Sequence, residues 1–150
     1  MSTDLTSLYQ DVIIEHARRP RNFGRVPAAT CVLDGHNPLC GDQLTLYLTL
    51  VDGRITEIGF EGAGCAISQA SASLMTVAMK GLTREQAMAL FGRVRTMLTV
   101  EPAEGGPVPD VGKLIALSGI WAYPMRVKCA SLAWQTLRGA LDDSARLGAE

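Results

Sequence analysis

Four cysteines are the residues of this sequence best suited to chemistry, and Cys40 is the first of three that stand at unusual positions. It follows the turn sequence Asn37-Pro38-Leu39 and precedes Gly41-Asp42. Residues two apart in an extended segment face the same side, so the Cys40 thiol and the Asp42 carboxylate can point to one spot. Two anions there repel each other unless a cation lies between them. The pair is therefore either part of a metal site or an exposed turn thiol beside a solvated acid.

Cys65 is predicted to stand at the start of a helix. It follows Glu61-Gly62-Ala63-Gly64, a sequence typical of a tight turn between a strand and a helix, and precedes a helical pattern over 67–80. The amides and the dipole of a helix N-terminus stabilise a thiolate, so Cys65 is a candidate metal ligand or nucleophile. The turn lacks the lysine of a P-loop and the remaining glycines of a dinucleotide fingerprint, which argues against phosphate binding.

Cys129 is predicted to repeat this arrangement. A last helix is expected over 128–146, and Arg126 and Lys128 stand just before the cysteine. Cations and a helix start both stabilise a thiolate. Cys31 differs, because it lies in a strand pattern without a neighbouring glycine or charge. We expect a small buried side chain there.

Three thiols and one carboxylate are an admissible tetrahedral ligand set for zinc. The gaps of 25 positions from Cys40 to Cys65 and of 64 positions from Cys65 to Cys129 contain no C-x2-C pair, so spacing alone identifies no zinc-finger class. His36 is a rival ligand four residues before Cys40. We expect it instead in a turn or beside the ligands.

Composition limits what else the chain can do. Its 150 residues predict one domain over 1–150. A net charge of −1 offers no basic track for a nucleic acid, and an aromatic fraction of 5% offers no stacking platform for bases. No apolar run is long enough for a membrane span, and the N-terminus has no basic region of a secretory leader. We therefore expect a cytoplasmic protein with reduced cysteines.

The elements that must position these residues predict an α+β fold, a three-stranded antiparallel sheet packed against about five helices. Leucines alternate with polar residues over 44–50, and Asp52-Gly53 is a strong hairpin signal before the return strand. Thr83 with Gln86 predicts a capping box. The expected strands are 30–34, 44–50 and 54–60; the expected helices are one of about 14 residues from Leu5, then 67–80, 83–97, 113–117 and 128–146, with an irregular loop over 101–110.

The first helix is expected to end before Pro20, and its end carries a basic segment over 16–22, His-Ala-Arg-Arg-Pro-Arg-Asn. Cations at a helix C-terminus complement the dipole, and proline stops the helix. The segment is either an ordinary charge-complemented helix end or a basic patch that docks a partner. We expect His16 to pack or to hydrogen-bond within the first helix.

Three stretches carry a family resemblance, namely NPLCGD at 37–42, FEGAGCAISQAS at 60–71 and RVKCA at 126–130. They resemble the three cysteine motifs of IscU-like (NifU N-terminal) iron–sulfur cluster assembly proteins, and the opening from Leu8 to Asn22 is similar as well. Scaffold members of that family carry a histidine immediately before the last cysteine. This chain has Lys128 there and a long segment between the second and third motifs, which resembles the SufU branch.

The resemblance to the SufU branch implies a zinc-dependent sulfurtransferase. Its zinc ligands would be Cys40, Asp42, Cys65 and Cys129. Cys40 would be the acceptor thiol: a histidine of a SufS-type cysteine desulfurase would displace it from the metal, and it would take persulfide sulfur and carry it to downstream cluster-assembly proteins. Arg126 and Lys128 would offset the negative charge around the ligands, unless they are ordinary surface cations.

Two other functions stay open. The same thiolates could bind iron or hold a [2Fe–2S] cluster that is passed to apo-proteins, as scaffold relatives do, although Lys128 replaces a ligand that a scaffold would use. Alternatively, the metal could be a structural clip between strands and helices, in which case its removal would unfold the domain.

Overall fold

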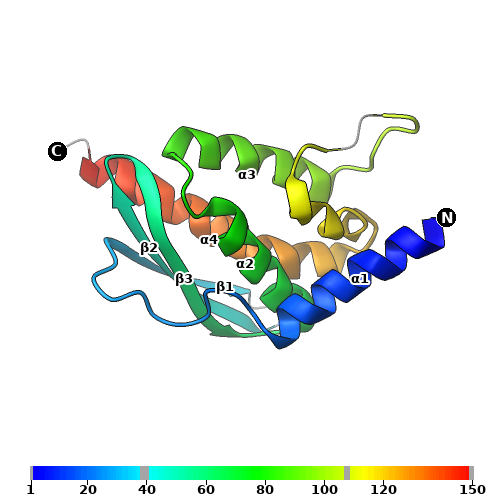
Figure 1. Ribbon diagram of the computed structural model, residues 1–150, viewed down its shortest axis with the longest axis horizontal. Coiled ribbons are helices and arrows are strands. Elements are labelled where there is room, and N and C mark those ends of the chain that lie inside the picture. The colour runs from blue at the N-terminus through cyan, green and yellow to red at the C-terminus, as the bar shows by residue number, and fades with distance from the viewer. Residues whose placement is uncertain (1, 38–40, 107–108, 149–150) are drawn as a thin grey trace.

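The structure, a computed structural model, describes residues 2–37, 41–106 and 109–148. It is a sheet with helices gathered over one face, and the long helix α4 runs across the strands (Figure 1). The elements in chain order are α1 (Ser2–Arg18), β1 (Cys31–Asn37), β2 (Asp42–Val51), β3 (Arg54–Ala63), α2 (Ala66–Met79), α3 (Arg84–Thr99), the short 3₁₀ helices η1 (Gly112–Leu117) and η2 (Ile120–Ala122), and α4 (Pro124–Gly148).

The three strands form an antiparallel sheet in the order β1-β2-β3, which confirms the predicted α+β class. The alternation in β2 decides which face is buried: Leu44, Leu46 and Leu48 are buried, and their neighbours are more exposed. The hairpin signal is also confirmed, because Asp52 and Gly53 both have positive φ, at 53° and 77°.

The core lies between the sheet and the helices. α4 packs on β1 and β2, α2 packs on β3 and α4, and α1 packs beside α2 (Figure 1). Buried polar groups cross the α2–α4 interface: the Ser71 hydroxyl donates to the carbonyl of Ala130 at 2.7 Å, and Trp134 Nε1 donates to Ser71 Oγ at 3.0 Å. These bonds fix the two helices against each other, because breaking them would leave buried polar groups unsatisfied.

The start of the last helix was predicted wrongly. α4 begins at Pro124, so it already includes 124–127. Proline suits the first turn of a helix, where its missing N–H has no intrahelical partner and its fixed φ is helical. The N–H of Val127 donates to the carbonyl of Tyr123 at 3.0 Å, as expected for the first turn after that residue. Pro124 therefore starts the helix, and Cys129 is not at its N-terminus.

Other boundaries shift less. β1 continues to Asn37 beyond the expected 30–34, because its pairing with β2 extends to Asp42. α1 has 17 residues, and η2 was not predicted. The capping box of Thr83 and Gln86 is confirmed. The described parts of 101–110 contain no helix or strand, as expected. Within the described ranges, every helix falls short of the length or the hydropathy that a bilayer-spanning segment requires.

Candidate metal centre

Three predicted ligands come together from three separate elements. Asp42 is the first residue of β2, Cys65 is the N-cap of α2, and Cys129 lies in the second turn of α4. One carboxylate oxygen and the two Sγ atoms all lie within 4.8 Å of one another. The fold thus assembles a cluster of one oxygen and two sulfur donors from residues that are far apart in sequence.

Asp42 is the buried centre of this cluster, at 1% relative exposure. Its Oδ1 accepts a hydrogen bond from the backbone N–H of Cys65 at 3.0 Å. Its Oδ2 lies 3.8 Å from Cys65 Sγ. One carboxylate thus orients the turn that carries Cys65 and contacts the sulfur itself.

Glycines make room for this carboxylate. A Cβ on Gly64 would lie 2.6 Å from Asp42 Oδ1 and 3.0 Å from its Cγ. A Cβ on Gly62 would collide with the carbonyl oxygen of Gln43 on the neighbouring strand. The glycine-rich sequence was interpreted as a tight turn, and its further role is clearance for Asp42. That role could not be predicted, because the carboxylate is 22 positions away in sequence.

The connection between β1 and β2 brings Asp42 to the end of the sheet. Asn37 pairs with Asp42 across the two strands. The N–H of Gly41 donates to the carbonyl of Asn37 at 2.8 Å, and Gly41 has a φ of 73°, which favours glycine. Backbone pairing therefore fixes the chain on both sides of residues 38–40.

Cys65 and Cys129 differ in exposure. Cys65 is exposed and makes no side-chain capping bond, so its sulfur is not tied to the amides of its own helix. Cys129 is 7% exposed and lies on the inner side of α4. The cluster therefore has one sulfur at the surface and one in the interior.

The donor set fits zinc. In a tetrahedral site with bonds of about 2.3 Å to sulfur and about 2.1 Å to oxygen, a sulfur and an oxygen ligand lie about 3.6 Å apart. The distance between Cys65 Sγ and Asp42 Oδ2 is 3.8 Å. A mixed set of thiolates and a carboxylate also suits a borderline-soft divalent cation better than calcium or magnesium, which prefer oxygen alone.

The other two cysteines were predicted as a ligand and a core residue. Cys40 lies outside the described residues, so its predicted role as ligand and acceptor stays a prediction. Cys31 lies in β1 as expected, but it is only half-buried, and its Sγ lies 3.7 Å from the carbonyl oxygen of Ala140. Strand β1 is at the edge of the sheet, which leaves this side chain less covered than predicted.

The predicted neighbours of the ligands are all exposed. The Arg126 guanidinium lies over the Tyr123 ring, 4.5 Å from its centroid. Lys128 lies on α4 immediately before Cys129 and lines a small cavity together with His36. His36 was expected either in a turn or beside the ligands. It lies in β1, paired with Gln43, so the expectation of a turn was wrong. The role of the two cations beside the ligands stays a prediction.

The chain is similar to proteins of one family. The model of the NifU-like N-terminal domain matches residues 8–130. The chain is 39% identical to the zinc-dependent sulfurtransferase SufU of Bacillus subtilis, over 91% of this chain and 90% of that protein. It is also 39% identical to the iron–sulfur cluster assembly scaffold protein IscU of Thermotoga maritima, over 93% of this chain and 96% of that protein.

A solved structure shares the fold. The crystal structure of a putative iron–sulfur cluster assembly scaffold protein for the SUF system from Fervidobacterium islandicum superposes with a TM-score of 0.80. It is 34% identical in sequence, and the similarity covers 90% of this chain and 97% of that one.

Proposed function

The chain belongs to the NifU-like N-terminal domain family, with the fold of the IscU/SufU-type iron–sulfur cluster assembly proteins, and on that premise we propose that it is a zinc-dependent sulfurtransferase. It accepts persulfide sulfur on Cys40 from a SufS-type cysteine desulfurase and carries it to downstream cluster-assembly proteins. The observation that carries the proposal is the convergence of Asp42, Cys65 and Cys129 within 4.8 Å. Cys40 is the proposed fourth ligand.

Chain connectivity supports Cys40 as that ligand. It is two residues before Asp42, so its Cα lies within about 7.6 Å of the Asp42 Cα whatever the conformation. A zinc site with four protein ligands needs one more donor beside the three that converge. Lys128 cannot supply it, because an ammonium group has no lone pair to donate.

The proposed sulfur transfer is a thiol–disulfide type of exchange and needs no external oxidant. The Cys40 thiolate attacks the terminal sulfur of the desulfurase persulfide, a new S–S bond forms on Cys40, and the desulfurase S–S bond breaks. The desulfurase cysteine leaves as a thiolate, and Cys40 becomes the persulfide. The chain thus carries sulfane sulfur without net gain or loss of electrons.

The residues around Cys40 have distinct parts in this proposal. Bound zinc would keep its cysteine ligands deprotonated without adding redox chemistry of its own. Asp42 orients the Cys65 turn through its bond to the Cys65 N–H, and this bond involves no atom of Cys40. The exposed side of Cys65 gives a partner access, and the buried Cys129 anchors the centre to α4.

A second function, that of a cluster scaffold, has support from several of the comparisons. The scaffold IscU of Thermotoga maritima is as similar in sequence as the SufU of Bacillus subtilis, at 39% each. A scaffold would bind iron or a [2Fe–2S] cluster with the same thiolates. Metal analysis of the chain purified without oxygen separates the two: we expect one zinc per chain and no visible absorbance, whereas iron with visible absorbance would favour the scaffold.

The central test is a sulfur-transfer assay with a SufS-type desulfurase. Cys40→Ser should abolish both the stimulation of the desulfurase and the added sulfur seen by mass spectrometry on the chain. Cys31→Ser is the matched control, because Cys31 lies in β1 and not among the converging donors, and it should behave as the unaltered chain. Normal stimulation by Cys40→Ser would overturn the mechanism.

Asp42→Asn distinguishes the proposal from a structural clip. The amide keeps an oxygen for the Cys65 N–H but removes the charge. We expect metal affinity to fall by about a hundredfold or more, and sulfur acceptance with it, while the melting temperature of the metal-free chain stays within a few degrees. A large fall in the melting temperature that accounts for the lost activity would favour the structural clip.

A further inference from the structure

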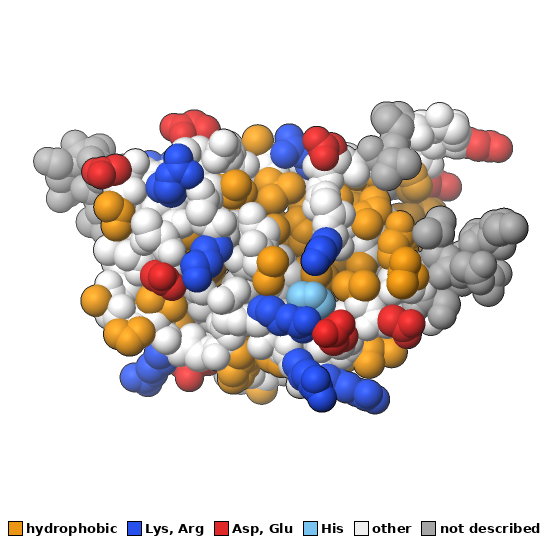
Figure 2. All heavy atoms as spheres, in the orientation of Figure 1, with side chains coloured by type: hydrophobic (Ala, Val, Ile, Leu, Met, Phe, Trp, Pro, Cys, Tyr) orange, Lys and Arg blue, Asp and Glu red, His pale blue; other side chains and the backbone are white. Residues whose placement is uncertain are grey.

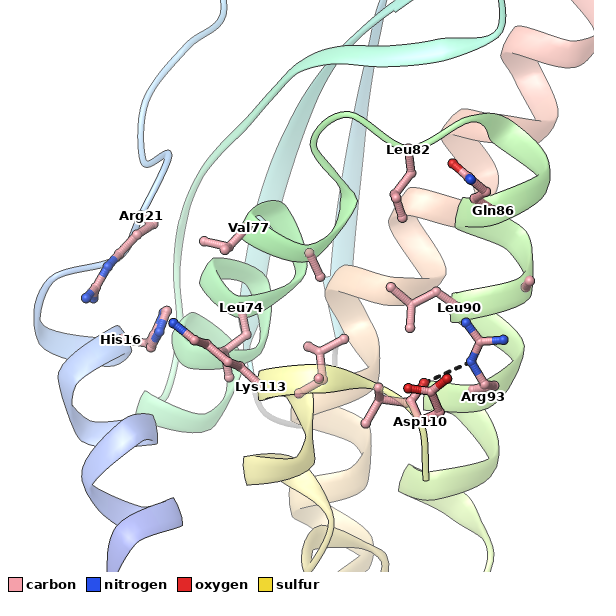
Figure 3. Close-up of a pocket in the computed structure, with 15 residues that line it drawn as sticks. His16, Arg21, Leu74, Val77, Leu82, Gln86, Leu90, Arg93, Asp110 and Lys113 are labelled. Carbon is pink, nitrogen blue, oxygen red and sulfur yellow. Dashed lines mark hydrogen bonds between the residues drawn. The ribbon is translucent and has the colours of Figure 1, made fainter. Parts of the chain in front are cut away.

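A cavity lies at the other end of α2 from Cys65. It has a volume of about 760 Å³, within the usual size of small-molecule pockets. Its walls come from the end of α1, the C-terminal half of α2, α3 and the start of η1 (Figure 3). α2 and α3 both pack on α4, and the cavity occupies the space that opens between them.

One end of the cavity is basic. His16 and Lys113 lie there, with Arg21 beside them and its guanidinium turned away from the cavity, and Arg93 and Asp110 lie at the opposite end (Figure 3). Arg93 Nε donates to the backbone carbonyl of Asp110 at 3.0 Å, so the opposite end holds charges of both signs. Figure 2 shows the same face, with apolar side chains gathered beside a histidine and several basic side chains.

His16 is the buried donor of the basic end, at 8% relative exposure. Its Nδ1 lies 2.7 Å from Ser73 Oγ, and this hydroxyl also accepts the N–H of Arg21 at 2.8 Å. Among the described residues, the one acceptor within reach of the Ser73 hydroxyl hydrogen is His16 Nδ1. Burial, assisted by Arg21 and Lys113, lowers the pKa of His16, so the ring is neutral at pH 7. If the Ser73 hydroxyl donates to Nδ1, the ring proton is on Nε2, for which the described residues supply no partner.

The charge at this end suits a monoanion. Arg21 and Lys113 are both positive, but the Arg21 guanidinium donates to Glu15 Oε1 at 2.8 Å and to the carbonyl of Arg19 at 2.9 Å. With a neutral His16, the group keeps one net positive charge. No ion pair of Lys113 occurs within the described ranges. A singly charged carboxylate matches this balance better than a doubly charged phosphate.

The rest of the cavity is apolar. The side chains of Leu74, Leu90 and Leu114 are buried in its floor, and Val77 on α2 remains 47% exposed at its rim. Burying an aliphatic chain against these groups is favourable, at about 25 cal/mol for each Å² removed from water. A ligand that fits both parts has an anionic head and an aliphatic tail.

We propose that this cavity binds a small aliphatic carboxylate, with its head at His16 and Lys113, beside the backbone of Arg21, and its tail against Leu74, Val77 and Leu90. The site is separate from the metal centre and independent of the proposed function. It also gives the basic segment over 16–22 a specific role, since His16 and Arg21 belong to that segment.

The test uses octanoate as probe and the chain as purified, followed by amide chemical shifts in NMR. Octanoate should shift the amides of Val77, Leu90 and Gly112 saturably, and octanol and acetate should bind at least fivefold more weakly. Lys113→Gln should weaken octanoate at least fivefold. Lys80→Gln is the matched control, because Lys80 pairs with Glu57 outside the cavity, and it should change affinity less than twofold.

Several results would overturn the proposal. Equal affinities for octanol and octanoate would show that the cavity does not recognise an anionic head. A higher affinity for octyl phosphate than for octanoate would show that the head it prefers is a phosphate and not a carboxylate. Equal losses of octanoate affinity in Lys113→Gln and Lys80→Gln would show that the affinity depends on the overall charge of the protein and not on Lys113. If octanoate caused no saturable shifts in these amides, the cavity would not be its binding site. Val77→Asp checks the tail independently: it introduces a carboxylate at the half-exposed rim, and it should weaken octanoate at least fivefold.

Discussion

The two helices that carry the cysteines of the candidate metal centre present them in different ways. Cys65 is the residue before the first turn of α2, where its own backbone, with φ of −69° and ψ of 168°, ends the turn from β3. Cys129 is the sixth residue of α4, inside the hydrogen-bonded ladder. The first sulfur is positioned by a local turn and the second by the packing of a whole helix.

Because of this difference, the two sulfurs differ in how accessible they are from the surface and in how easily they can move. The turn at Cys65 is held by the Asp42 carboxylate, so its position depends on a contact that a ligand or a partner can alter. The backbone of Cys129 moves only if α4 moves, and α4 is held against α2 by the hydrogen bonds of Ser71 and Trp134. The centre therefore has one rigid buried side and one adjustable exposed side.

Proline substitutions test the two helix starts directly, and Lys128→Pro has the largest expected effect. In a helix that begins at Pro124, residue 128 donates to the carbonyl of residue 124. A proline there removes that bond and clashes with the carbonyl, which costs about 3 kcal/mol or more of unfolding free energy. Urea denaturation of the purified variant measures the loss.

Ala66→Pro is the matched control on α2. Residue 66 is the first residue of that helix, and Cys65 before it has the extended conformation that a following proline requires. We expect a change of less than about 1 kcal/mol. If both variants lost similar stability, the two helix starts would not differ as described.

The sequence predicted the α2 side of the centre well and the α4 side poorly. Gly64-Cys65 before a helical pattern is a local signal, and it identified the cap correctly. At α4, Pro124 was interpreted as a break, although proline is equally typical of a first helical turn. The hydrogen bond from the Val127 N–H to the Tyr123 carbonyl decides between these, and the sequence pattern does not specify whether it forms.

In the rest of the fold as well, features set by local sequence were predictable, and features set by contacts between distant residues were not. The strands and the hairpin at Asp52-Gly53 were predictable because alternation and turn chemistry are local. The convergence of Asp42, Cys65 and Cys129 was proposed from a family resemblance and not from spacing. The clearance at Gly64 and the cavity at His16 depend on residues that meet only in the folded chain.

Gly64→Ala has an intermediate expected effect and acts on the adjustable side alone. Its Cβ would lie 2.6 Å from Asp42 Oδ1, so the carboxylate or the turn must move. We expect about 1–3 kcal/mol of lost stability and about tenfold weaker zinc binding, measured by competition with a chelator.

Gly119→Ala is the control for this effect, because a Cβ there would meet no atom within 4 Å. It should leave the zinc affinity unchanged and the stability within about 0.5 kcal/mol. A Gly64→Ala variant with the zinc affinity of the unaltered chain would show that the Cys65 turn does not depend on the position of Asp42.

Pro124→Ala has the smallest expected effect and tests the rigid side. If Pro124 is the first residue of α4, its fixed φ restricts the unfolded chain and already matches the helix, so alanine loses about 0.4–1 kcal/mol of stability. Helix content by circular dichroism should stay the same, because the Val127 bond to Tyr123 does not involve the substituted side chain. If Pro124 instead interrupted the chain, alanine would lengthen the helix and raise both stability and helix content. A gain in either quantity would thus move the start of α4 toward Cys129 and remove the contrast between the two sulfurs.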